Sequence, residues 1–311
     1  MFRTFLIPIL PTLSVLTLAS ALAAADALPL DTARIDAVTG LKGALNPEEA
    51  VYKVTQPRVD VKVVVDGTPM PPFMGLTTWA AFTADPKGGA MVMGDLVLLP
   101  DEVAPVMDAL FANGLTVTAL HNHFLFDQPQ VLFMHIGGQD TADKLAAGVR
   151  AALDQVKQVR AQSPAAAKPT PHPPLPATSS IPTEAIAAII GAKAATKDGM
   201  AKFTIGRAVA MPCDCTVGKE MGVNTWAAFM GSAEVALVDG DFATGPGELQ
   251  PVLHALRAGG ITVVAIHSHM EGETPRLIFL HYWGIGTAQE LAKTVRNALD
   301  AQGRAALPPG K

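Results

Sequence analysis

The chain has 311 residues, of which 49% are hydrophobic and 16% charged, and its formal net charge is −5. This length is typical of two domains with separate cores, and the composition is that of a folded protein rather than a disordered one. The sparse, slightly acidic charge, without a basic cluster, argues against a nucleic-acid partner. No phosphate-binding loop, dinucleotide fingerprint or nucleophile elbow is present, so we expect no nucleotide cofactor.

Residues 1–25 have the pattern of a secretory signal peptide. Arg3 supplies the positive charge, Phe5–Leu18 the apolar core and Ala21-Leu22-Ala23 the small-residue cleavage pattern. Pro8, Pro11 and the short apolar run argue against an uncleaved anchor. We therefore expect a soluble protein, exported to the periplasm or secreted, with no membrane span after cleavage.

The first half of the chain alternates strand and helix patterns. In order, these are a short helix at Asp31–Leu41, strands at Pro57–Gly67, Thr77–Phe82 and Ala90–Leu98, a helix at Asp101–Asn113, a β-hairpin at Leu115–Gly138 and a helix at Thr141–Val159. Asn113-Gly114 is a good C-terminal stop for the middle helix. The sequence predicts a first repeat domain over residues 28–160.

A Pro- and Ala-rich segment at 161–183 is typical of an extended linker, and a second repeat domain over 184–303 follows. It contains a strand at Glu234–Asp239, a helix at Pro246–Ala258, a hairpin at Ile261–Gly284 and a helix at Thr287–Ala301. The fold class is therefore α+β, with two homologous repeats, each a mostly antiparallel sheet with a His-x-His hairpin and two main helices. We expect a pseudo-twofold arrangement in which sheet or helix faces of the repeats pack together.

Six of the eight histidines form two matched triads. They are His121, His123 and His135 in the first repeat and His267, His269 and His281 in the second, with a constant displacement of 146 residues. Side chains two apart on a strand share a face, so His267 and His269 point the same way. If Met270 pairs with Arg276, Ala265 lies opposite His281, and the third ring joins the other two. A loop one residue shorter would send His281 to the other face.

Three converging imidazoles suit a divalent transition metal, with Zn first and Mn, Fe or Cu as alternatives. Glu273 and its counterpart Asp127 are candidates for a fourth ligand or a general base. Arg276, Trp226 and Trp79 are candidates for substrate binding, although a surface salt bridge or core packing is the commoner role of such residues.

Three further residues have simpler interpretations. His254 aligns with Asp108 and is interpreted as a helix-surface residue. Cys213 and Cys215 favour a local disulfide or free thiols over a soft-metal site.

Several motifs make the chain similar to a known family. Thr-Trp-Ala-Ala-Phe occurs at 78–82, and Pro-Arg-Leu-Ile-Phe-Leu-His-Tyr-Trp-Gly at 275–284. With the His-x-His motif, these resemble the LppY/LpqO family over roughly Ile35 to Asp300. The resemblance implies an exported protein with a duplicated domain and no agreed reaction. The first copy departs from the pattern, with Gln130 in place of Arg and Ile136-Gly137 in place of an aromatic pair.

Two classes of function follow. The first is a metal-binding protein, for which the sequence leaves open whether it acts as a metal-dependent hydrolase or lyase on a small substrate. The second is a non-catalytic binding protein or a duplicated interaction scaffold in the cell envelope. An open coordination position in a cleft would favour the enzyme. The sequence leaves the metal, the substrate and the oligomeric state open.

Overall fold

The computed structural model describes residues 30–163 and 172–305, so the predicted signal segment 1–25 and the linker residues 164–171 lie outside it. The first repeat contains α1 (Thr32–Thr39), β1 (Ala44–Asn46), β2 (Val51–Pro57), β3 (Val63–Val65), β4 (Thr68–Met70), the 3-10 turn η1 (Pro72–Met74), β5 (Thr77–Ala84), β6 (Ala90–Leu98), α2 (Pro100–Ala112), β7 (Thr116–His121), β8 (Asp127–Gln128), β9 (Leu132–Asp140) and α3 (Ala142–Gln162).

The second repeat follows the same order. It contains α4 (Thr183–Ile190), β10 (Ala194–Lys197), β11 (Met200–Gly206), β12 (Val209–Ala210), β13 (Thr216–Val217), the 3-10 turn η2 (Lys219–Met221), β14 (Asn224–Gly231), β15 (Ala236–Thr244), α5 (Leu249–Ala258), β16 (Thr262–His267), β17 (Ile278–Gly286) and α6 (Ala288–Ala305). The two repeats and the α+β class are confirmed.

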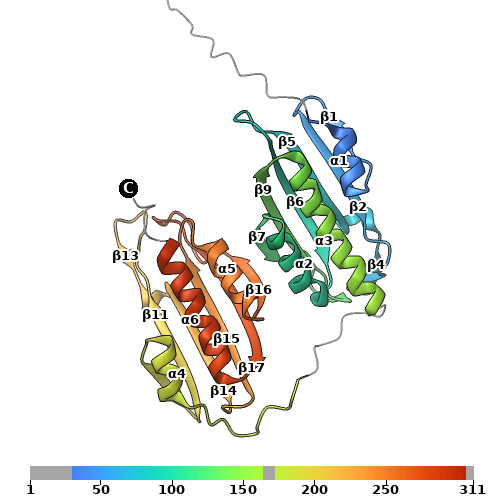
Figure 1. Cartoon of the computed structure of the whole chain (residues 1–311). Coiled ribbons are helices and arrows are strands. Elements are labelled where there is room, and N and C mark those ends of the chain that lie inside the picture. Colours follow the sequence, from blue (N-terminus) through green and yellow to red (C-terminus); the bar gives the residue numbers. More distant parts are fainter. Residues whose placement is uncertain (1–29, 164–171, 306–311) are drawn as a thin grey trace, which may run out of the picture.

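One antiparallel sheet of 12 strands runs through both repeats, in the order β1-β2-β5-β6-β9-β7-β16-β17-β15-β14-β11-β10. The helices lie on one face of this sheet (Figure 1). The main core lies between the helices and this face. The opposite face has no helix over it in the described part of the chain.

Strand alternation decides which side chains reach the core. On β5, Thr78, Ala80 and Phe82 are buried, and Ala80 and Phe82 belong to the main core. Trp79 and Ala81, which alternate with them, therefore point to the helix-free face. The same rule directs the histidines of β7, β9, β16 and β17 to the helix-free face, because their neighbours Leu120, Met134, Ile266 and Leu280 lie in the main core.

The two repeats join edge to edge. β7 pairs with β16, and Leu120 lies opposite Ile266. These two residues are 146 positions apart and so are equivalent in the two repeats, as a twofold relation at the junction requires. The predicted pseudo-twofold arrangement is thus present. Strand pairing joins the two halves of the sheet, and the predicted packing of helix faces occurs between α2 and α5.

Helices α2 and α5 meet over this junction. Phe111 stacks on His254 with ring centroids 4.0 Å apart, and Arg257 pairs with Asp108 at 2.8 Å. Position 111 is equivalent to 257 and position 108 to 254, so the two contacts are related by the same pseudo-twofold relation. His254 is an exposed residue of α5, as predicted, and its ring also takes part in the contact between the repeats.

Two small clusters of apolar side chains lie apart from the main core. One contains Val63, Leu76, Val97, Leu99, Val131 and Phe133. The other contains Val209, Val223, Ala243, Leu277 and Phe279. Each supports the loops of one repeat. Phe133 and Phe279 also become platforms for histidine rings, as described below.

Two local predictions differ from the structure. The segment Pro57–Gly67 is not one strand, because β2 ends at Pro57 and β3 begins only at Val63. The reason is Arg58, which is 6% exposed and whose guanidinium donates to Glu102 at 2.6 Å. The short helix α4 was not predicted, although it repeats α1 in the second half.

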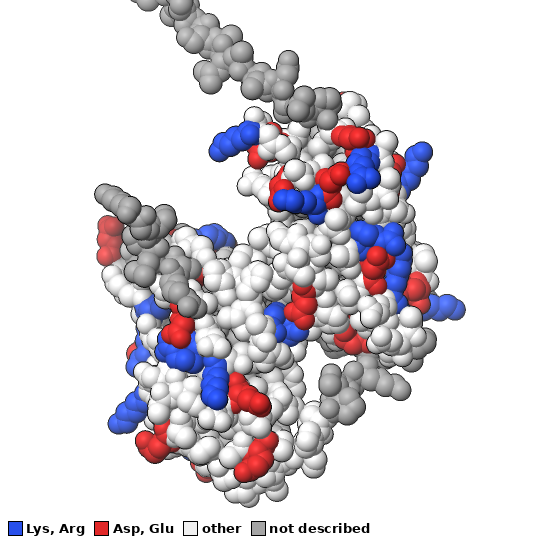
Figure 2. All heavy atoms as spheres, in the orientation of Figure 1, with Lys and Arg blue, Asp and Glu red and all other residues white. Residues whose placement is uncertain are grey.

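On the face seen in Figure 2, positively and negatively charged side chains are interspersed, without a large patch of one charge. No helix within the described residues is long and apolar enough to cross a membrane.

Candidate metal centre

The register of β16 and β17 brings two of the second repeat's histidines together. Ala265 lies opposite His281, as predicted, and His267 lies opposite Phe279. The ladder shifts between Val263 and Ala265, at a bulge. His269 lies beyond the end of β16, in the connection to β17. The predicted register between the strands therefore places His267 and His281 together. Alternation along one strand, which was predicted to place His269 beside His267, does not apply, because β16 ends at His267.

The three rings of the second repeat form a cluster. The ring of His267 stacks on His281 with centroids 4.9 Å apart, and its centroid lies 5.0 Å from that of His269. The Nε2 atoms of His267 and His269 are 3.1 Å apart. The ring of His269 is held by Phe279, on which it stacks at 3.5 Å.

The first repeat builds the same framework. His121 stacks on His135 with centroids 5.1 Å apart and lies 5.1 Å from His123. His123 stacks on Phe133 at 3.4 Å. The structure thus brings together all three predicted histidines in each repeat. The distances between the histidine rings are nearly the same in the two repeats, although their sequences differ. The cluster is therefore a feature of the repeated unit.

A carboxylate that was not predicted completes the second cluster. Asp241 on β15 lies directly opposite His281, and its Oδ2 is 3.5 Å from Nε2 of His269. Ligand atoms of Asp241, His267 and His269 all lie within 4.8 Å of one another, and no other described group of three acidic, His or Cys residues meets this limit. Two imidazoles and one carboxylate are a recognised donor set for Zn and non-haem Fe.

Burial makes the Asp241 carboxylate unusual. The residue is 2% exposed, and within the described chain its Oδ1 is buried without a hydrogen-bond partner. Burial raises the pKa of Asp241 to about 6, against the lowering influence of His281. A buried carboxylate with an unsatisfied oxygen is costly unless a cation compensates for its charge.

Asp95 holds the equivalent place in the first repeat. It lies opposite His135 on the next strand, is 7% exposed, and its Oδ1 also has no partner among the described residues. Its Oδ2 is 3.9 Å from Nε2 of His135. The sequence carried a signal for this pair, since Gly94-Asp95 and Gly240-Asp241 repeat at the same displacement of 146 residues.

Four of the clustered histidines have lowered pKa values, which favours the neutral form that binds metals. Burial lowers the pKa of His267, and the neighbouring rings of His281 and His269 lower it further. Burial also lowers the pKa of His269, of His121 and of His123. Neutral imidazole is the ligand form, so these rings need not release a proton near pH 7 in order to coordinate.

The predicted loop carboxylates lie elsewhere in the turn. Glu273 accepts a hydrogen bond from the Leu277 N–H at 3.0 Å, and Asp127 accepts one from the Val131 N–H at 2.7 Å. The Leu277 N–H holds the pKa of Glu273 below its ordinary value. Both acids therefore close the loop between the strands, and neither belongs to the group formed by Asp241, His267 and His269.

Two segments of the chain match the model of one protein family. The model of a family described as Domain of Unknown Function (DUF1259) matches residues 33–155 and again residues 184–301. The chain belongs to the DUF1259 family. The match confirms the duplicated domain, whereas the name LppY/LpqO stays a prediction. No curated protein matches the chain.

Solved structures show only weak likeness to this DUF1259 chain. A trimeric bacterial microcompartment shell protein, PduB, has 11% identity and a TM-score of 0.20, with 83% of this chain and 89% of that chain covered. The ethanolamine utilization protein EutL from Leptotrichia buccalis C-1013-b has 12% identity and a TM-score of 0.19, with 71% and 84% covered. Aspartate kinase from Synechocystis has 11% identity and a TM-score of 0.17, with 71% and 41% covered. Scores this low carry no argument about this chain.

The predicted tryptophans extend each cluster outward. Trp79 lies opposite Asp95, and Trp226 lies opposite Asp241. A lysine ammonium covers each ring, Lys53 at 4.3 Å from the centroid of Trp79 and Lys202 at 4.2 Å from that of Trp226. Arg276 is exposed in the loop before β17, and its charge helps to lower the pKa of Glu273.

Both DUF1259 repeats present their clusters on the same face of the continuous sheet. The first spans β6, β9 and β7, and the second spans β16, β17 and β15. Their middle strands, β9 and β17, are three strand positions apart. With about 4.8 Å between neighbouring strands, the two cluster centres lie about 15 Å apart.

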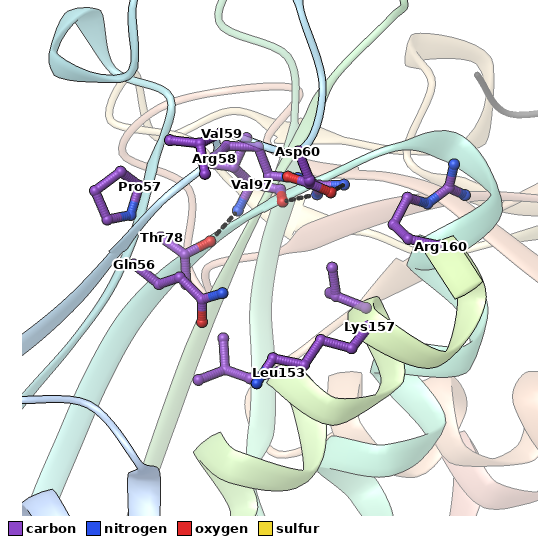
Figure 3. Close-up of a pocket in the computed structure, with 11 residues that line it drawn as sticks. Gln56, Pro57, Arg58, Val59, Asp60, Thr78, Val97, Leu153, Lys157 and Arg160 are labelled. Atoms are coloured by element: carbon purple, nitrogen blue, oxygen red, sulfur yellow. Dashed lines mark hydrogen bonds and ion pairs between the residues drawn. The ribbon is translucent and has the colours of Figure 1, made fainter. Parts of the chain in front are cut away.

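A cavity on the other side of the first repeat is charge-balanced. It has a volume of about 260 Å³ and lies between the Arg58 segment and the last turns of α3 (Figure 3). Arg58 pairs with Glu102 and Asp60, and Arg160 pairs with Asp101 and Glu102. Arg207 and Glu248 repeat the Arg58–Glu102 pair in the second half. These buried pairs tie the loop after β2 or β11 to the start of the next helix.

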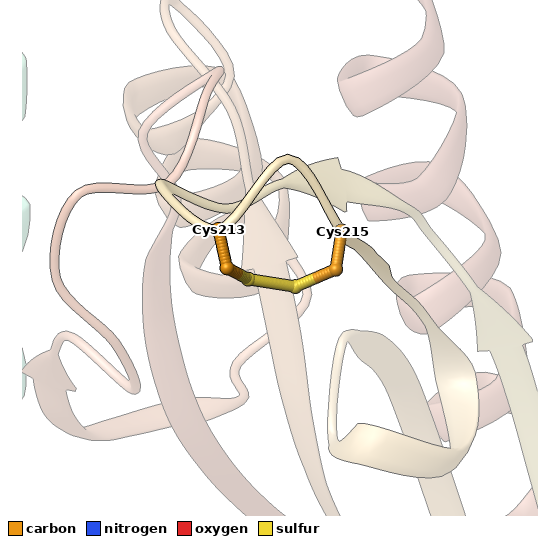
Figure 4. Close-up of a disulfide and its surroundings, with 2 residues drawn as sticks. All are labelled: Cys213 and Cys215. Atoms are coloured by element: carbon orange, nitrogen blue, oxygen red, sulfur yellow. A yellow bond between two sulfur atoms is a disulfide. The ribbon is translucent and has the colours of Figure 1, made fainter.

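The two cysteines form a disulfide in a tight turn, Cys213–Cys215, with Cα atoms 5.3 Å apart (Figure 4). Of the two fates favoured from the sequence, the structure thus has the local disulfide. No free cysteine remains among the described residues, and the soft-metal alternative has no thiolate to use.

Proposed function

We propose that this DUF1259 chain binds a divalent transition metal ion through His267, His269 and Asp241, and a second ion through the equivalent residues of the first repeat. The observation that carries the proposal is the buried Asp241 carboxylate, which has an unsatisfied oxygen and faces neutral imidazoles. A bound cation would balance the negative charge of the buried Asp241 carboxylate.

The donor set favours an ion with an exchangeable position. Three protein ligands leave room for water or a small ligand, as in catalytic zinc sites. A zinc-bound water has a pKa near 7, which is the chemistry of a metal-dependent hydrolase or lyase. Among the candidate metals, Zn and Fe suit two imidazoles and one carboxylate best.

The first repeat supports its own site more weakly. Its rings have the same spacing, and Asp95 has the same unsatisfied oxygen. Its donor atoms lie farther apart than the donor atoms of Asp241, His267 and His269. We therefore expect the second repeat to bind the tighter ion.

Export is part of the same proposal. The Cys213–Cys215 disulfide supports it, because such bonds persist in oxidising compartments. An N-terminus determined on the mature protein should begin after Ala23. A mature chain that still began at Met1 would contradict export by a cleaved signal.

A calorimetric titration of metal-free protein with Zn²⁺ tests the metal sites. We expect two binding events of unequal affinity in the wild type, and loss of the tighter one in His267→Ala/His269→Ala. The matched control is His121→Ala/His123→Ala, which should lose the weaker event alone. Equal titration curves for the wild type and both variants would favour the non-catalytic scaffold instead.

A further inference from the structure

A groove adjoins the first histidine cluster on the helix-free side of the sheet. It has a volume of about 280 Å³, and its lining includes Lys53, Phe73, Thr77 and Trp79 together with Asp95 and His123. Because His123 and Asp95 belong to the cluster, the groove and the candidate metal site are one continuous space. A cavity of this size holds a small molecule.

One end of the groove offers a positive charge. The Lys53 ammonium lies over the Trp79 ring, and no carboxylate of the described residues lies within ion-pair distance of it. The ring holds the lysine in place without neutralising it. An anionic group that entered here would find a positioned cation.

Aromatic side chains form one part of the groove wall. The Trp79 ring forms part of the lining, and Phe73 of η1 is 96% exposed. A large aromatic side chain left in water next to a cavity is a surface on which a flat ligand can stack. Gly75 turns the chain directly after η1 with a φ of 98°, and it keeps this side of the groove free of a side chain.

The second repeat provides a natural contrast. Its groove is lined by Lys202, Lys219, Glu220 and Asn224, among others, and has a volume of about 350 Å³. Glu220 stands where the first repeat has Phe73, and Lys219 pairs with it at 3.2 Å. A glutamate in that position gives no aromatic surface for stacking. The second groove therefore lacks the exposed aromatic ring of the first, and neither an aspartate nor a histidine of its cluster lines it.

We propose that the groove of the first repeat binds a small organic anion with a flat apolar body, of the aromatic carboxylate class. Its anionic group pairs with Lys53, its ring lies against Trp79 and Phe73, and its far edge faces His123. The last contact rests on the proposed function, because a metal held there would meet the ligand, whereas recognition by Lys53 and Phe73 does not require the metal.

The test uses benzoate and its uncharged analogue benzamide, titrated into the full chain and followed by NMR, with and without Zn²⁺. We expect benzoate to bind and benzamide to bind at least about tenfold more weakly, the loss of about 1.4 kcal/mol that one charged contact provides. Lys53→Met and Phe73→Glu should each weaken benzoate binding by a similar factor. Both residues are exposed, and thermal unfolding should show that these variants stay folded.

Lys202→Met is the matched control, because Lys202 covers Trp226 as Lys53 covers Trp79. It should leave benzoate affinity unchanged. Equal losses in Lys53→Met and Lys202→Met, or equal affinity for benzoate and benzamide, would overturn the inference. Binding of benzoate that depends on Lys53 in a chain that takes up no Zn²⁺ would support the groove and contradict the metal proposal. Zn²⁺ uptake without benzoate binding would do the reverse.

Discussion

Asp95 and Asp241 hold the same position in the two repeats, each buried on a strand directly beside a histidine of the neighbouring strand. Asp95 faces His135 and Asp241 faces His281. Each has one oxygen without a partner among the described residues. Each repeat therefore has a buried carboxylate with an unsatisfied oxygen next to three imidazole rings. A positively charged ligand best explains this arrangement.

The substitution Asp241→Asn removes the charge and keeps the shape of the side chain. We expect Zn²⁺ affinity of the second repeat to fall by at least about tenfold, and more if the carboxylate coordinates directly. The metal-free protein should unfold at an equal or higher temperature, because a buried unpaired charge is gone. Calorimetry and thermal unfolding measure the two effects. Unchanged Zn²⁺ affinity would show that Asp241 is not a ligand.

The distance between the two clusters follows from the sheet. Cu²⁺ bound in both repeats should give a dipolar coupling in electron paramagnetic resonance that corresponds to about 15 Å, three strand spacings. The His267→Ala/His269→Ala variant should lose the coupling and keep one Cu²⁺ signal. A Cu²⁺–Cu²⁺ distance well beyond about 20 Å would contradict the pairing of β7 with β16, because three strand spacings in a continuous sheet amount to only about 15 Å.

Much of the cluster could be predicted from the sequence because strand geometry is local. The displacement of 146 residues revealed the duplication, and alternation along the strands placed Ala265 opposite His281. The same displacement marks Asp95 and Asp241 as equivalent, but local alternation does not place Asp241 beside His281, because that contact depends on the pairing of β15 with β17 across about forty positions of chain. The same limit applies to Arg58, whose local alternation suggests a strand while its partner Glu102 lies beyond four further strands.

The junction was missed for a related reason. Leu120 and Ile266 look like ordinary core residues of their own strands, and both are. In a single repeat, β7 or β16 would be an edge strand with unpaired backbone groups. The sequence does not show which strand lies at the edge of a sheet, so it does not show that the repeats pair there.

Gln250 should be the most important polar side chain at this junction. Its amide accepts from the Val117 N–H at 3.2 Å and donates to the Val117 carbonyl at 2.7 Å, so Gln250→Ala leaves buried backbone groups without partners. We expect a loss of about 1–3 kcal/mol in the free energy of unfolding by urea. Asp108→Asn, which breaks a half-exposed ion pair at the same junction, should cost less than about 1 kcal/mol. Equal costs would show that the Val117 contact contributes no more than the surface pair.

The partly buried pair Arg207–Glu248 should make stability depend on pH. Burial alone would raise the pKa of Glu248, but hydrogen bonds from Arg207 and Gly245 lower it below the ordinary value of 4.5. A lowered pKa stabilises the fold above the unfolded value and loses this contribution as the pH falls through the folded value. Arg207→Met should therefore cost about 1–3 kcal/mol near pH 7, because Glu248 loses one of its hydrogen-bond partners.

The difference between Arg207→Met and the wild type should shrink below about pH 4.5, as Glu248 is protonated in both. Urea unfolding at several pH values measures it. Arg34→Met, which breaks an exposed pair with Asp143, should show little effect at any pH. A penalty for Arg207→Met that stayed constant down to pH 3 would mean that the pair acts through packing rather than charge.

The metal content of the protein taken from its native compartment tests the central claim most directly. Elemental analysis should find between one and two equivalents of a single transition metal in the wild type, and at least one equivalent less in His267→Ala/His269→Ala. A wild type as free of metal as the double variant, with both chains folded, would contradict the assignment of these histidines and Asp241 to a metal centre.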